Sequence, residues 1–315
     1  MESILISDPI AQSGIDYLKQ QARLPDGQGF EVVLKPDITP EELIGEIGEY
    51  DGLIVRSRTK VTAEVIAAGQ KLKVIGRAGS GLDNIDVEAA KKAGVAVVNA
   101  PGANAQSVAE HTMALILALF RKLLPVATAL KAGRWEKKGY MATELSGKTI
   151  GIVGFGNVGM KVAEITHGFG MKLLVATRTQ TSEKEKTMKD LNGTLVTLDQ
   201  LLKESDVVTL HVPKSSETEH LIGEKELALM KKTSYLINCS RGGVVDEAAL
   251  IKALTTRQMA GAALDVFATE PLPADSPLLT LDNVILTPHI AAASAEAKER
   301  ASLLVAQAVA AALLV

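Results

Sequence analysis

Cysteine is almost absent from this sequence, and positive charge is not in excess. Cys239 is the single cysteine among 315 residues, which excludes an internal disulfide framework and a zinc site built from several cysteines. The formal net charge is −3, so we expect no polybasic surface that binds nucleic acid or an anionic membrane. We also expect no metal ion. The expected ligands are therefore small molecules.

The sequence also lacks a hydrophobic run long enough to cross a bilayer. The apolar run 113–120 is far shorter than the roughly 20 residues that a membrane helix needs, so a buried core helix is the better interpretation. The start, Met1-Glu2-Ser3, lacks the apolar segment of a signal peptide. These features predict a cytosolic globular enzyme. The abrupt end at Leu313-Leu314-Val315 leaves truncation of the chain open.

Short apolar runs rich in β-branched residues alternate with helical patterns along the whole chain. Such strands, separated by helices, are typical of parallel sheets covered on both faces. The sequence therefore predicts an α/β fold with two doubly wound, Rossmann-like domains and an active site in the cleft between them. The expected strands are residues 4–7, 30–34, 52–56, 74–77, 95–99, 149–153, 172–176, 207–212, 235–239, 262–266 and 284–287.

A long helical stretch, residues 105–135, indicates where the two domains join. It begins after Asn99-Ala100-Pro101-Gly102, where proline and glycine interrupt the pattern. The Ala-rich stretch 294–315 is also helical, and we expect it to return to the first domain. The prediction is a discontinuous substrate-binding domain, residues 1–101 with 290–315, and a dinucleotide-binding domain, residues 102–289.

The segment Gly154-Phe155-Gly156-Asn157-Val158-Gly159 has the pattern G-x-G-x-x-G between an apolar strand and a helix. Gly154 permits a tight turn, Gly156 lets the backbone approach a pyrophosphate, and Gly159 lets the helix pack closely on the strand. The context makes this match specific, so the sequence predicts a bound dinucleotide with Asn157 and Val158 at the start of the helix.

The turn after the next strand bears on the choice between NAD and NADP. A carboxylate about 20 residues after the glycines would bind the ribose 2′-hydroxyl. Here the chain reads Thr177-Arg178-Thr179, and the first acid is Glu183. Arginine can neutralise a 2′-phosphate that a carboxylate would repel. We therefore predict NADP(H), and NAD(H) is the alternative if Arg178 is only a solvated loop charge.

Arg241, Glu270 and His289 each follow a predicted strand, at the edge where open α/β sheets bind ligands. Histidine exchanges a proton near neutral pH, arginine matches a carboxylate, and a neighbouring glutamate orients the imidazole and favours its charged form. Taken singly, Arg241 and Glu270 would be surface ion-pair residues, but their shared spacing favours a site. Cys239 is better interpreted as a small buried apolar residue than as a nucleophile.

These motifs resemble the D-isomer-specific 2-hydroxyacid dehydrogenases over nearly the whole chain. The most specific runs are residues 154–159, 239–247, 263–267 and 287–289. Within that family, residues 52–61, 76–86 and 133–145 are most similar to the phosphoglycerate dehydrogenases. The resemblance implies hydride transfer between a nicotinamide cofactor and C2 of a small 2-hydroxy or 2-oxo acid, with Arg241, Glu270 and His289 as the catalytic triad.

The resemblance also assigns binding residues. Further cofactor contacts are implied at Val212, Pro213, Cys239, Ser240 and Asp265, the last near the nicotinamide carboxamide. The implied substrate contacts are Ser57, Ala78, Gly79 and Ser80 for the carboxylate, Arg56 and Arg77 for a second anionic group, and Asn99 with Ser107 beside the nicotinamide. The alternative for Arg56, Arg58, Lys60 and Arg77 is a solvated basic rim. A homodimer is implied as well, with residues 105–124 as its surface unless that helix is simply core.

Two departures from phosphoglycerate dehydrogenases keep alternatives open. Those enzymes usually carry aspartate where Thr177 stands, and many extend into C-terminal regulatory domains that this sequence does not contain. Both departures favour an NADPH-dependent glyoxylate or hydroxypyruvate reductase as the second candidate. A more distant one is a dinucleotide-sensing corepressor similar to C-terminal-binding protein, which would need a groove for a partner peptide.

Overall fold

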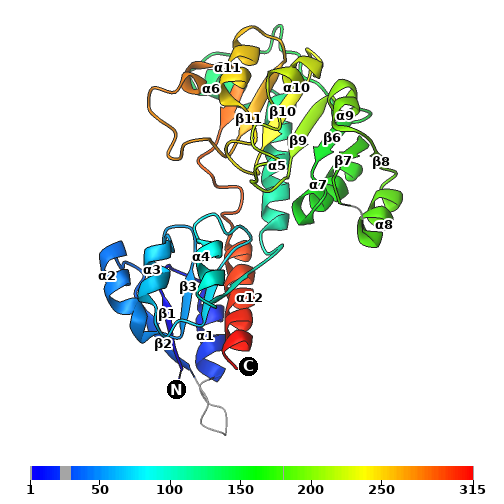
Figure 1. Ribbon diagram of the computed structural model, residues 1–315. Helices are drawn as coiled ribbons and strands as arrows, with labels where there is room; N and C mark the ends of the chain where they lie inside the picture. The colour runs from blue at the N-terminus through cyan, green and yellow to red at the C-terminus, as the bar shows by residue number, and fades with distance from the viewer. Residues whose placement is uncertain (1, 22–29, 180, 315) are drawn as a thin grey trace. The chain divides into compact units, whose positions relative to one another are not determined.

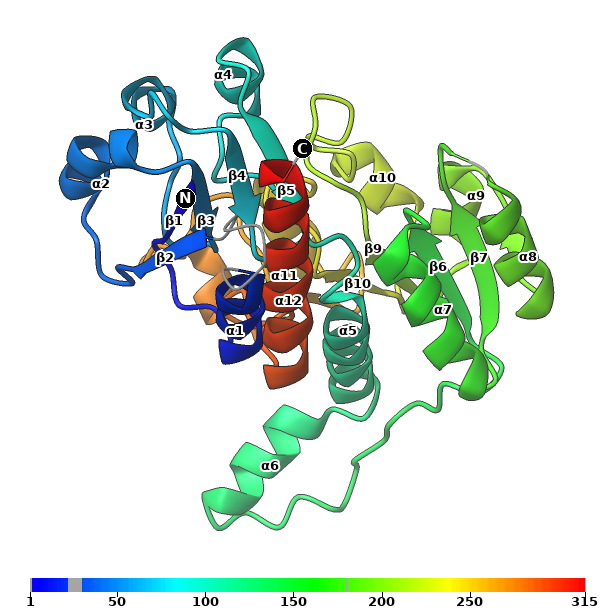
Figure 2. The ribbon, with the colours of Figure 1, turned by 90° about the horizontal axis from the view of Figure 1, so that it is seen from below.

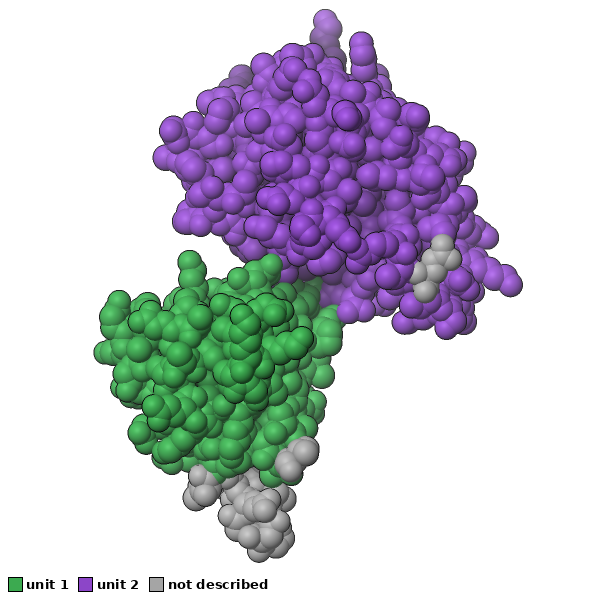
Figure 3. Space-filling model, in the orientation of Figure 1, with its two compact units in different colours: residues 1–104, 293–315 green, residues 105–292 purple. Residues whose placement is uncertain are grey.

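The computed structural model describes residues 2–21, 30–179 and 181–314. The chain divides into two compact units (Figure 3). Unit 1 comprises Met1–Asn104 with Ala293–Val315, and unit 2 comprises Ala105–Ala292. Each unit contains its own parallel sheet and its own core, so each is described by itself.

Unit 1 is built on a five-stranded parallel sheet in the order β2-β1-β3-β4-β5 (Figure 1). The central strands are buried on both faces, which explains their continuous apolar sequence. Its strands are β1 (Glu2–Ile6), β2 (Phe30–Leu34), β3 (Gly52–Val55), β4 (Val74–Arg77) and β5 (Ala96–Asn99). Helices α1 (Gln12–Gln21) and α12 (Ala295–Leu313) cover one face, and α2 (Pro40–Glu46), α3 (Ala63–Ala68) and α4 (Val87–Lys92) cover the other.

The last helix, α12, lies beside α1 and packs on the sheet of unit 1 (Figures 1 and 2). Ser294 caps its first turn by accepting a hydrogen bond from Ala297 N at 3.1 Å. Gly76 in β4 allows the close approach. A methyl group there would lie 2.5 Å from Val309 Cγ2 and 2.8 Å from Val305 Cγ2.

Unit 2 has a seven-stranded parallel sheet in the order β12-β11-β10-β9-β6-β7-β8. Its strands are β6 (Thr149–Val153), β7 (Lys172–Ala176), β8 (Thr194–Leu195), β9 (Val207–Leu210), β10 (Tyr235–Asn238), β11 (Gly261–Leu264) and β12 (Val284–Leu286). One face is covered by α5 (Ala105–Phe120) and α7 (Asn157–Gly168), and the other by α9 (Leu198–Glu204), α10 (Glu224–Leu229) and α11 (Glu247–Thr255). The remaining helices are α6 (Leu123–Lys131) and α8 (Ser182–Asp190).

The predicted fold class is confirmed, because both sheets are parallel and covered by helices on both faces. All eleven expected strands are present, and their ends lie within two residues of the expected ones. The edge strand β8 was missed because two residues are too few to form a recognisable pattern.

The prediction of one helix over residues 105–135 is wrong. The chain forms α5 and α6, which meet at an angle of 67°. Lys122 lies between them with φ of 48°, a left-handed conformation that ends the hydrogen-bonding pattern of α5. Pro125, in the first turn of α6, has no N–H to donate to the carbonyl group of Arg121 and so disfavours continuation of α5, a local signal that the prediction of one helix overlooked.

The two helices also differ in exposure. Most of α5 belongs to the core of unit 2, whereas α6 exposes about half of Leu123, Leu124 and Leu130. In Figure 2, α6 and the run that leads to β6 extend away from α5 and the sheet of this unit. Among residues 2–21, 30–179 and 181–314, no single helix is long and apolar enough to cross a membrane. Only α5 and α6 taken together, bent as they are, reach that length and composition.

The close approach of α12 makes a stability prediction. We expect Gly76→Ala to lower the free energy of unfolding by roughly 1–3 kcal/mol, since the added methyl overpacks a filled core. The matched control is Gly45→Ala in α2, where a methyl group would meet nothing within 4 Å. That change should be neutral or stabilising by about 0.5–1 kcal/mol. Urea unfolding measures both, and a wild-type midpoint for Gly76→Ala would contradict this account.

Candidate active site

The loops after β11 and β12 bring Glu270 and His289 together. His289 Nδ1 lies 2.7 Å from Glu270 Oε2, and the other carboxylate oxygen of Glu270 accepts a hydrogen bond from Phe267 N at 3.0 Å. Glu270 is thus oriented by its own loop and in turn orients the imidazole. The side chain of His289 is 49 % exposed, so the ring is accessible to a ligand.

The loop after β10 carries Arg241 and runs against the loop that leads to Glu270. A methyl group on Gly242 would overlap with Phe267 O, so only glycine allows this contact. The side chain of Asn238, at the end of β10, ties the turn on both sides. Its amide nitrogen donates to Arg241 O at 3.0 Å, and its oxygen accepts hydrogen bonds from the Ser240 amide and hydroxyl.

Asn238 was missed in the sequence. The sequence offered a weak signal for it, because an asparagine in an otherwise apolar strand is usually buried and hydrogen-bonded. The two residues expected to contact a cofactor here, Cys239 and Ser240, are both buried.

The loop after β12 is held by the buried carboxylate of Asp265. It accepts hydrogen bonds from Thr287 Oγ1 at 2.6 Å, Ile290 N at 2.9 Å and Ala291 N at 2.8 Å. His289 lies inside this clasp with φ of 54°, a left-handed conformation that is costly for a non-glycine residue. Besides the cofactor contact expected for it, Asp265 therefore positions the histidine.

The glycine-rich loop has the shape that a dinucleotide fold requires. Gly154 has φ of 90°, and a methyl group there would lie 2.6 Å from His211 O. A methyl group on Gly159 would overlap with Gly154 O, which explains the close packing of α7 on the loop. At Gly156, by contrast, a methyl group would meet no described atom within 4 Å, so the space above the backbone is open to a ligand.

This open space lies at the start of α7. The first amides of a helix lack partners within it, and an anion is stabilised there. Asn157 and Val158 occupy these first positions, and among the described residues no side chain caps them at Gly156. The loop and helix therefore fit a bound pyrophosphate, as the motif predicts.

Two cationic side chains lie at the turn after β7, whereas the sequence had indicated only Arg178. Arg178 forms an ion pair with Glu217 and remains 77 % exposed. Lys184, in α8, donates hydrogen bonds to Thr179 O at 3.1 Å and to Thr179 Oγ1 at 2.8 Å, so it lies at the same turn. Lys184 and Glu217 were both missed, because neither belongs to the turn in sequence.

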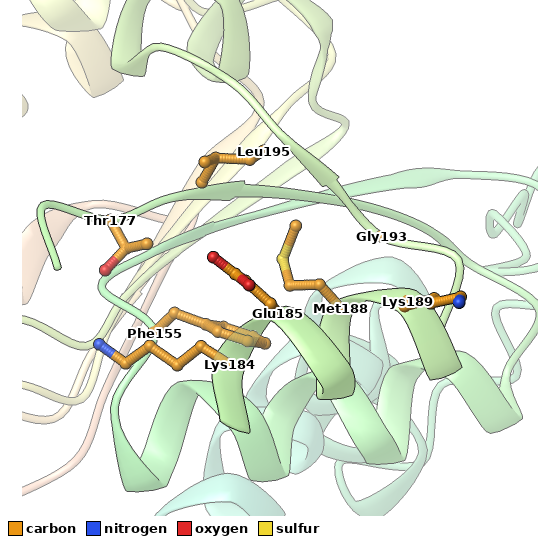
Figure 4. A pocket seen from close by; sticks show the side chains of 8 residues that line it. All are labelled: Phe155, Thr177, Lys184, Glu185, Met188, Lys189, Gly193 and Leu195. Carbon is orange, nitrogen blue, oxygen red and sulfur yellow. The ribbon is translucent and has the colours of Figure 1, made fainter. Parts of the chain in front are cut away.

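A pocket of about 270 Å³ opens beside this turn (Figure 4). Phe155 of the glycine-rich loop, Met188 and Leu195 form its apolar wall. Thr177 lies at one side, and Figure 4 shows Lys184 extending toward that side. The pocket is therefore continuous with residues expected to bind the cofactor.

Two titratable groups of unit 2, Cys239 and His211, are held neutral by burial. Burial raises the pKa of the Cys239 thiol to about 12, against the lowering effect of a hydrogen bond with Thr112. Burial likewise lowers the pKa of His211 to about 3. Neither is suited to be a nucleophile or a base near neutral pH. The expected cofactor contacts Val212 and Pro213 follow His211 directly, and Val212 packs near Gly154.

In unit 1, the expected substrate residues gather at the ends of β3 and β4. Arg77 Nη2 donates to Ser57 Oγ at 3.2 Å, and the guanidinium lies over Gly79. The amides of Ala78 and Gly79 donate to Val55 O and Arg77 O, both at 2.8 Å. In this conformation those two amides are thus engaged within the protein, and the side chains of Ser57 and Arg77 are better placed to meet an anion.

The remaining expected residues are divided between the units. Asn99, at the end of β5, donates to Ser80 O at 2.6 Å, and Ser80 Oγ donates to Asn104 Oδ1 at 2.8 Å. Arg56 Nη1 lies 3.4 Å from Pro9 O. Ser107 belongs to α5 in unit 2. Within residues 2–21, 30–179 and 181–314, no group of three or more His, Cys, Asp or Glu side chains is arranged to hold a metal ion.

Residues 113–291 match a family model described as the NAD binding domain of D-isomer specific 2-hydroxyacid dehydrogenases. The D-3-phosphoglycerate dehydrogenase of Archaeoglobus fulgidus is 44 % identical over 304 residues, which are 96 % of this chain and 56 % of that protein. The hydroxypyruvate reductase of Thermotoga maritima is also 44 % identical, over 94 % of this chain and 93 % of its own length. The chain thus spans about half the length of the phosphoglycerate dehydrogenases that it matches.

Solved structures show the same fold. A D-lactate dehydrogenase from Aquifex aeolicus, complexed with NAD and lactic acid, is 31 % identical with a TM-score of 0.81, and the match covers 99 % of this chain and 96 % of that one. An acyclic imino acid reductase in complex with NADPH and D-Arg is 32 % identical with a TM-score of 0.81, over 95 % and 93 % of the two chains. Of these two neighbours, one was solved with NAD and the other with NADPH.

Proposed function

The chain belongs to the D-isomer specific 2-hydroxyacid dehydrogenase family, and from that premise we propose that it transfers hydride between a nicotinamide cofactor and C2 of a small 2-hydroxy or 2-oxo acid. The observation that carries the proposal is the 2.7 Å contact between His289 Nδ1 and Glu270 Oε2. A carboxylate that orients an accessible imidazole is the arrangement that general acid–base catalysis requires.

In the direction of oxidation, His289 takes the proton of the C2 hydroxyl through Nε2, since Glu270 holds Nδ1. Glu270 stabilises the imidazolium that results, and in reduction His289 returns the proton. Arg241 pairs with the substrate carboxylate and polarises the oxygen on C2. The nicotinamide, when bound, supplies or accepts the hydride. Gly154, Gly156 and the start of α7 would hold its pyrophosphate.

We propose 3-phosphoglycerate and 3-phosphohydroxypyruvate as the substrate pair. Ser57 would bind the carboxylate, and Arg56 and Arg77 would bind the phosphate. The amides of Ala78 and Gly79 would join them only after leaving Val55 O and Arg77 O. One observation favours a second candidate, hydroxypyruvate reductase. The Thermotoga maritima enzyme of that name is 44 % identical to this chain, as is the Archaeoglobus fulgidus phosphoglycerate dehydrogenase.

A spectrophotometric panel tests this function. It crosses NADH and NADPH with 3-phosphohydroxypyruvate, hydroxypyruvate and glyoxylate. We expect turnover of at least one acid, and His289→Ala should lower kcat by roughly 100-fold or more, because general acid–base catalysis contributes about that much. Cofactor affinity, measured by fluorescence, should not change. His167→Ala, on the exposed end of α7, is the control. No turnover of any acid, or full activity of His289→Ala, would reject the proposal.

For the cofactor, we propose NADP(H) over NAD(H). The support is the pair of cations, Arg178 and Lys184, at a turn whose own residues 177–179 include no acid, although Glu217 pairs with Arg178 and Glu185 lines the neighbouring pocket. A 2′-phosphate would replace Glu217 as the partner of Arg178. Charge-assisted hydrogen bonds to phosphate are strong enough to displace an exposed ion pair.

The cofactor proposal predicts a selective defect. Arg178→Ala should raise KM for NADPH by roughly 10- to 100-fold, which is the loss of one charge-assisted hydrogen bond of about 1.5–3 kcal/mol. KM for NADH should change little. Lys186→Ala, which removes an exposed cation of α8 that pairs with Asp190, is the control for general electrostatics. Wild-type preference for NADH, or equal losses with both cofactors, would contradict NADP(H).

We also propose a homodimer, and the exposed leucines of α6 support it because apolar patches on such an element usually meet a partner. We expect sedimentation equilibrium to give twice the chain mass of 33.2 kDa. Leu130→Glu should shift the protein toward the monomer, since a buried unpaired charge is costly. Leu279→Glu should not, because Leu279 is equally exposed but belongs to the short helix Pro277–Thr280 and not to α6. A wild-type monomer would rule the dimer out.

A further inference from the structure

The segment that carries two of the proposed substrate residues has no secondary structure of its own. Residues 56–59 follow β3 and include Arg56 and Ser57, yet they form neither helix nor strand. A segment of this kind has many accessible conformations, and side chains from elsewhere must select one. In unit 1 two polar side chains bind its backbone, and the buried hydroxyl of Ser7 adds a hydrogen bond to Thr59 Oγ1 at 3.1 Å.

The first is Asp8, in the loop after β1, which is 1 % exposed. Its Oδ2 accepts hydrogen bonds from Arg56 N at 2.6 Å and from Thr59 N at 3.2 Å. Its Oδ1 accepts from Thr59 Oγ1 at 2.8 Å and from Arg58 Nε at 3.0 Å. One carboxylate therefore holds both ends of the segment and leaves Ser57 at its apex.

The second is Asn84, in the loop between β4 and α4. Its single amide nitrogen donates to Arg56 O at 2.8 Å and to Thr59 O at 2.7 Å. The amide N–H groups of Arg56 and Thr59 thus bind Asp8, while their carbonyl groups bind Asn84. We name these two residues, Asp8 and Asn84, the clamp.

The charge state of the clamp is fixed by the same contacts. Burial alone would raise the pKa of the Asp8 carboxyl group, but the hydrogen bonds from Arg56, Thr59 and Arg58 outweigh it and lower the pKa below its usual value. The carboxylate is therefore ionised at any pH near neutrality, and it can act only as an acceptor.

We propose that Asp8 and Asn84 are positioning residues that set the conformation of residues 56–59 and thereby the affinity of this enzyme for its anionic substrate. This proposal rests on the proposed function of Ser57 and Arg56. It goes beyond that function because neither clamp residue needs to touch the substrate. Ser57 Oγ accepts a hydrogen bond from Arg77 Nη2, so the clamp also sets where Ser57 meets that guanidinium.

The clamp differs from a carboxylate that only stabilises the sheet. Asp51 is such a residue in the same unit, where it accepts a hydrogen bond from Ser3 N at 3.0 Å and pairs with Lys73 at 3.1 Å. It precedes β3, whereas the segment 56–59 follows it. Asp51→Asn therefore removes a similar hydrogen-bonded charge without touching the segment, and it is the matched control.

The sign of the effect separates positioning from simple electrostatics. Asp8→Asn removes a negative charge beside Arg56 and Arg58, so electrostatics alone would tighten the binding of an anionic acid. The clamp predicts the opposite, because the new NH₂ group faces hydrogen-bond donors and releases the segment. Asn84→Asp adds a negative charge and places an acceptor against two carbonyl oxygens, and it should weaken binding as well.

The experiment measures steady-state kinetics of wild type, Asp8→Asn, Asn84→Asp and Asp51→Asn with saturating reduced cofactor. We expect both clamp variants to raise KM for the 2-oxo acid by roughly 10-fold or more, the equivalent of one lost hydrogen bond, with a much smaller change in kcat. Cofactor affinity should be unchanged in all variants. A KM of Asp8→Asn equal to or below that of Asp51→Asn overturns the proposal.

A second measurement does not depend on turnover. Trypsin cleaves after Arg56, Arg58 and Lys60, and a released segment is a better substrate than a clamped one. Limited digestion followed by mass spectrometry should show faster cleavage at these sites in Asp8→Asn and Asn84→Asp than in wild type or Asp51→Asn. If the wild type turns over no acid, the proposed function fails, and digestion still decides the clamp. Equal cleavage in all four proteins rejects it.

Discussion

Two buried carboxylates, Asp8 in unit 1 and Asp265 in unit 2, hold the loops on which the proposed chemistry depends. Burying a charge is costly unless hydrogen bonds replace the lost water. Asp8 accepts four and Asp265 accepts three, mostly from loop backbone. Each carboxylate therefore makes one loop conformation much more favourable than the others, since any other would leave a buried charge without donors.

The parallel sheets explain why such carboxylates are needed. Strands of one direction deliver all their following loops to one edge, and loop amides there have no neighbouring strand to bind. A buried acceptor at that edge replaces the missing partner. In unit 2 the result is the left-handed backbone of His289, which Asp265 holds on its C-terminal side while Glu270 holds the ring.

The sequence predicted those features whose causes are local. Apolar runs set the strands to within two residues, and Gly154 and Gly159 have the conformation and contacts that their motif implies. The clamp could not be found in this way, because Asp8 binds residues about 50 positions away and looks like an ordinary loop acid. The break at Lys122 was missed although it had a local cause, since Pro125 follows three residues later and disfavours a continuous helix.

The cofactor turn, residues 177–179, was predicted only in part, because Arg178 was identified from the sequence whereas Lys184 and Glu217 were not. The strength of its ion pair follows from the exposure of the two side chains. Arg178 and Glu217 are 77 % and 65 % exposed, so their ion pair contributes about 0–1 kcal/mol. A phosphate that accepts charge-assisted hydrogen bonds contributes about 1.5–3 kcal/mol for each one. The proposed exchange of Glu217 for a 2′-phosphate therefore costs Arg178 little in lost ion-pair energy. The ion pair keeps Arg178 at the turn where we propose that the cofactor binds.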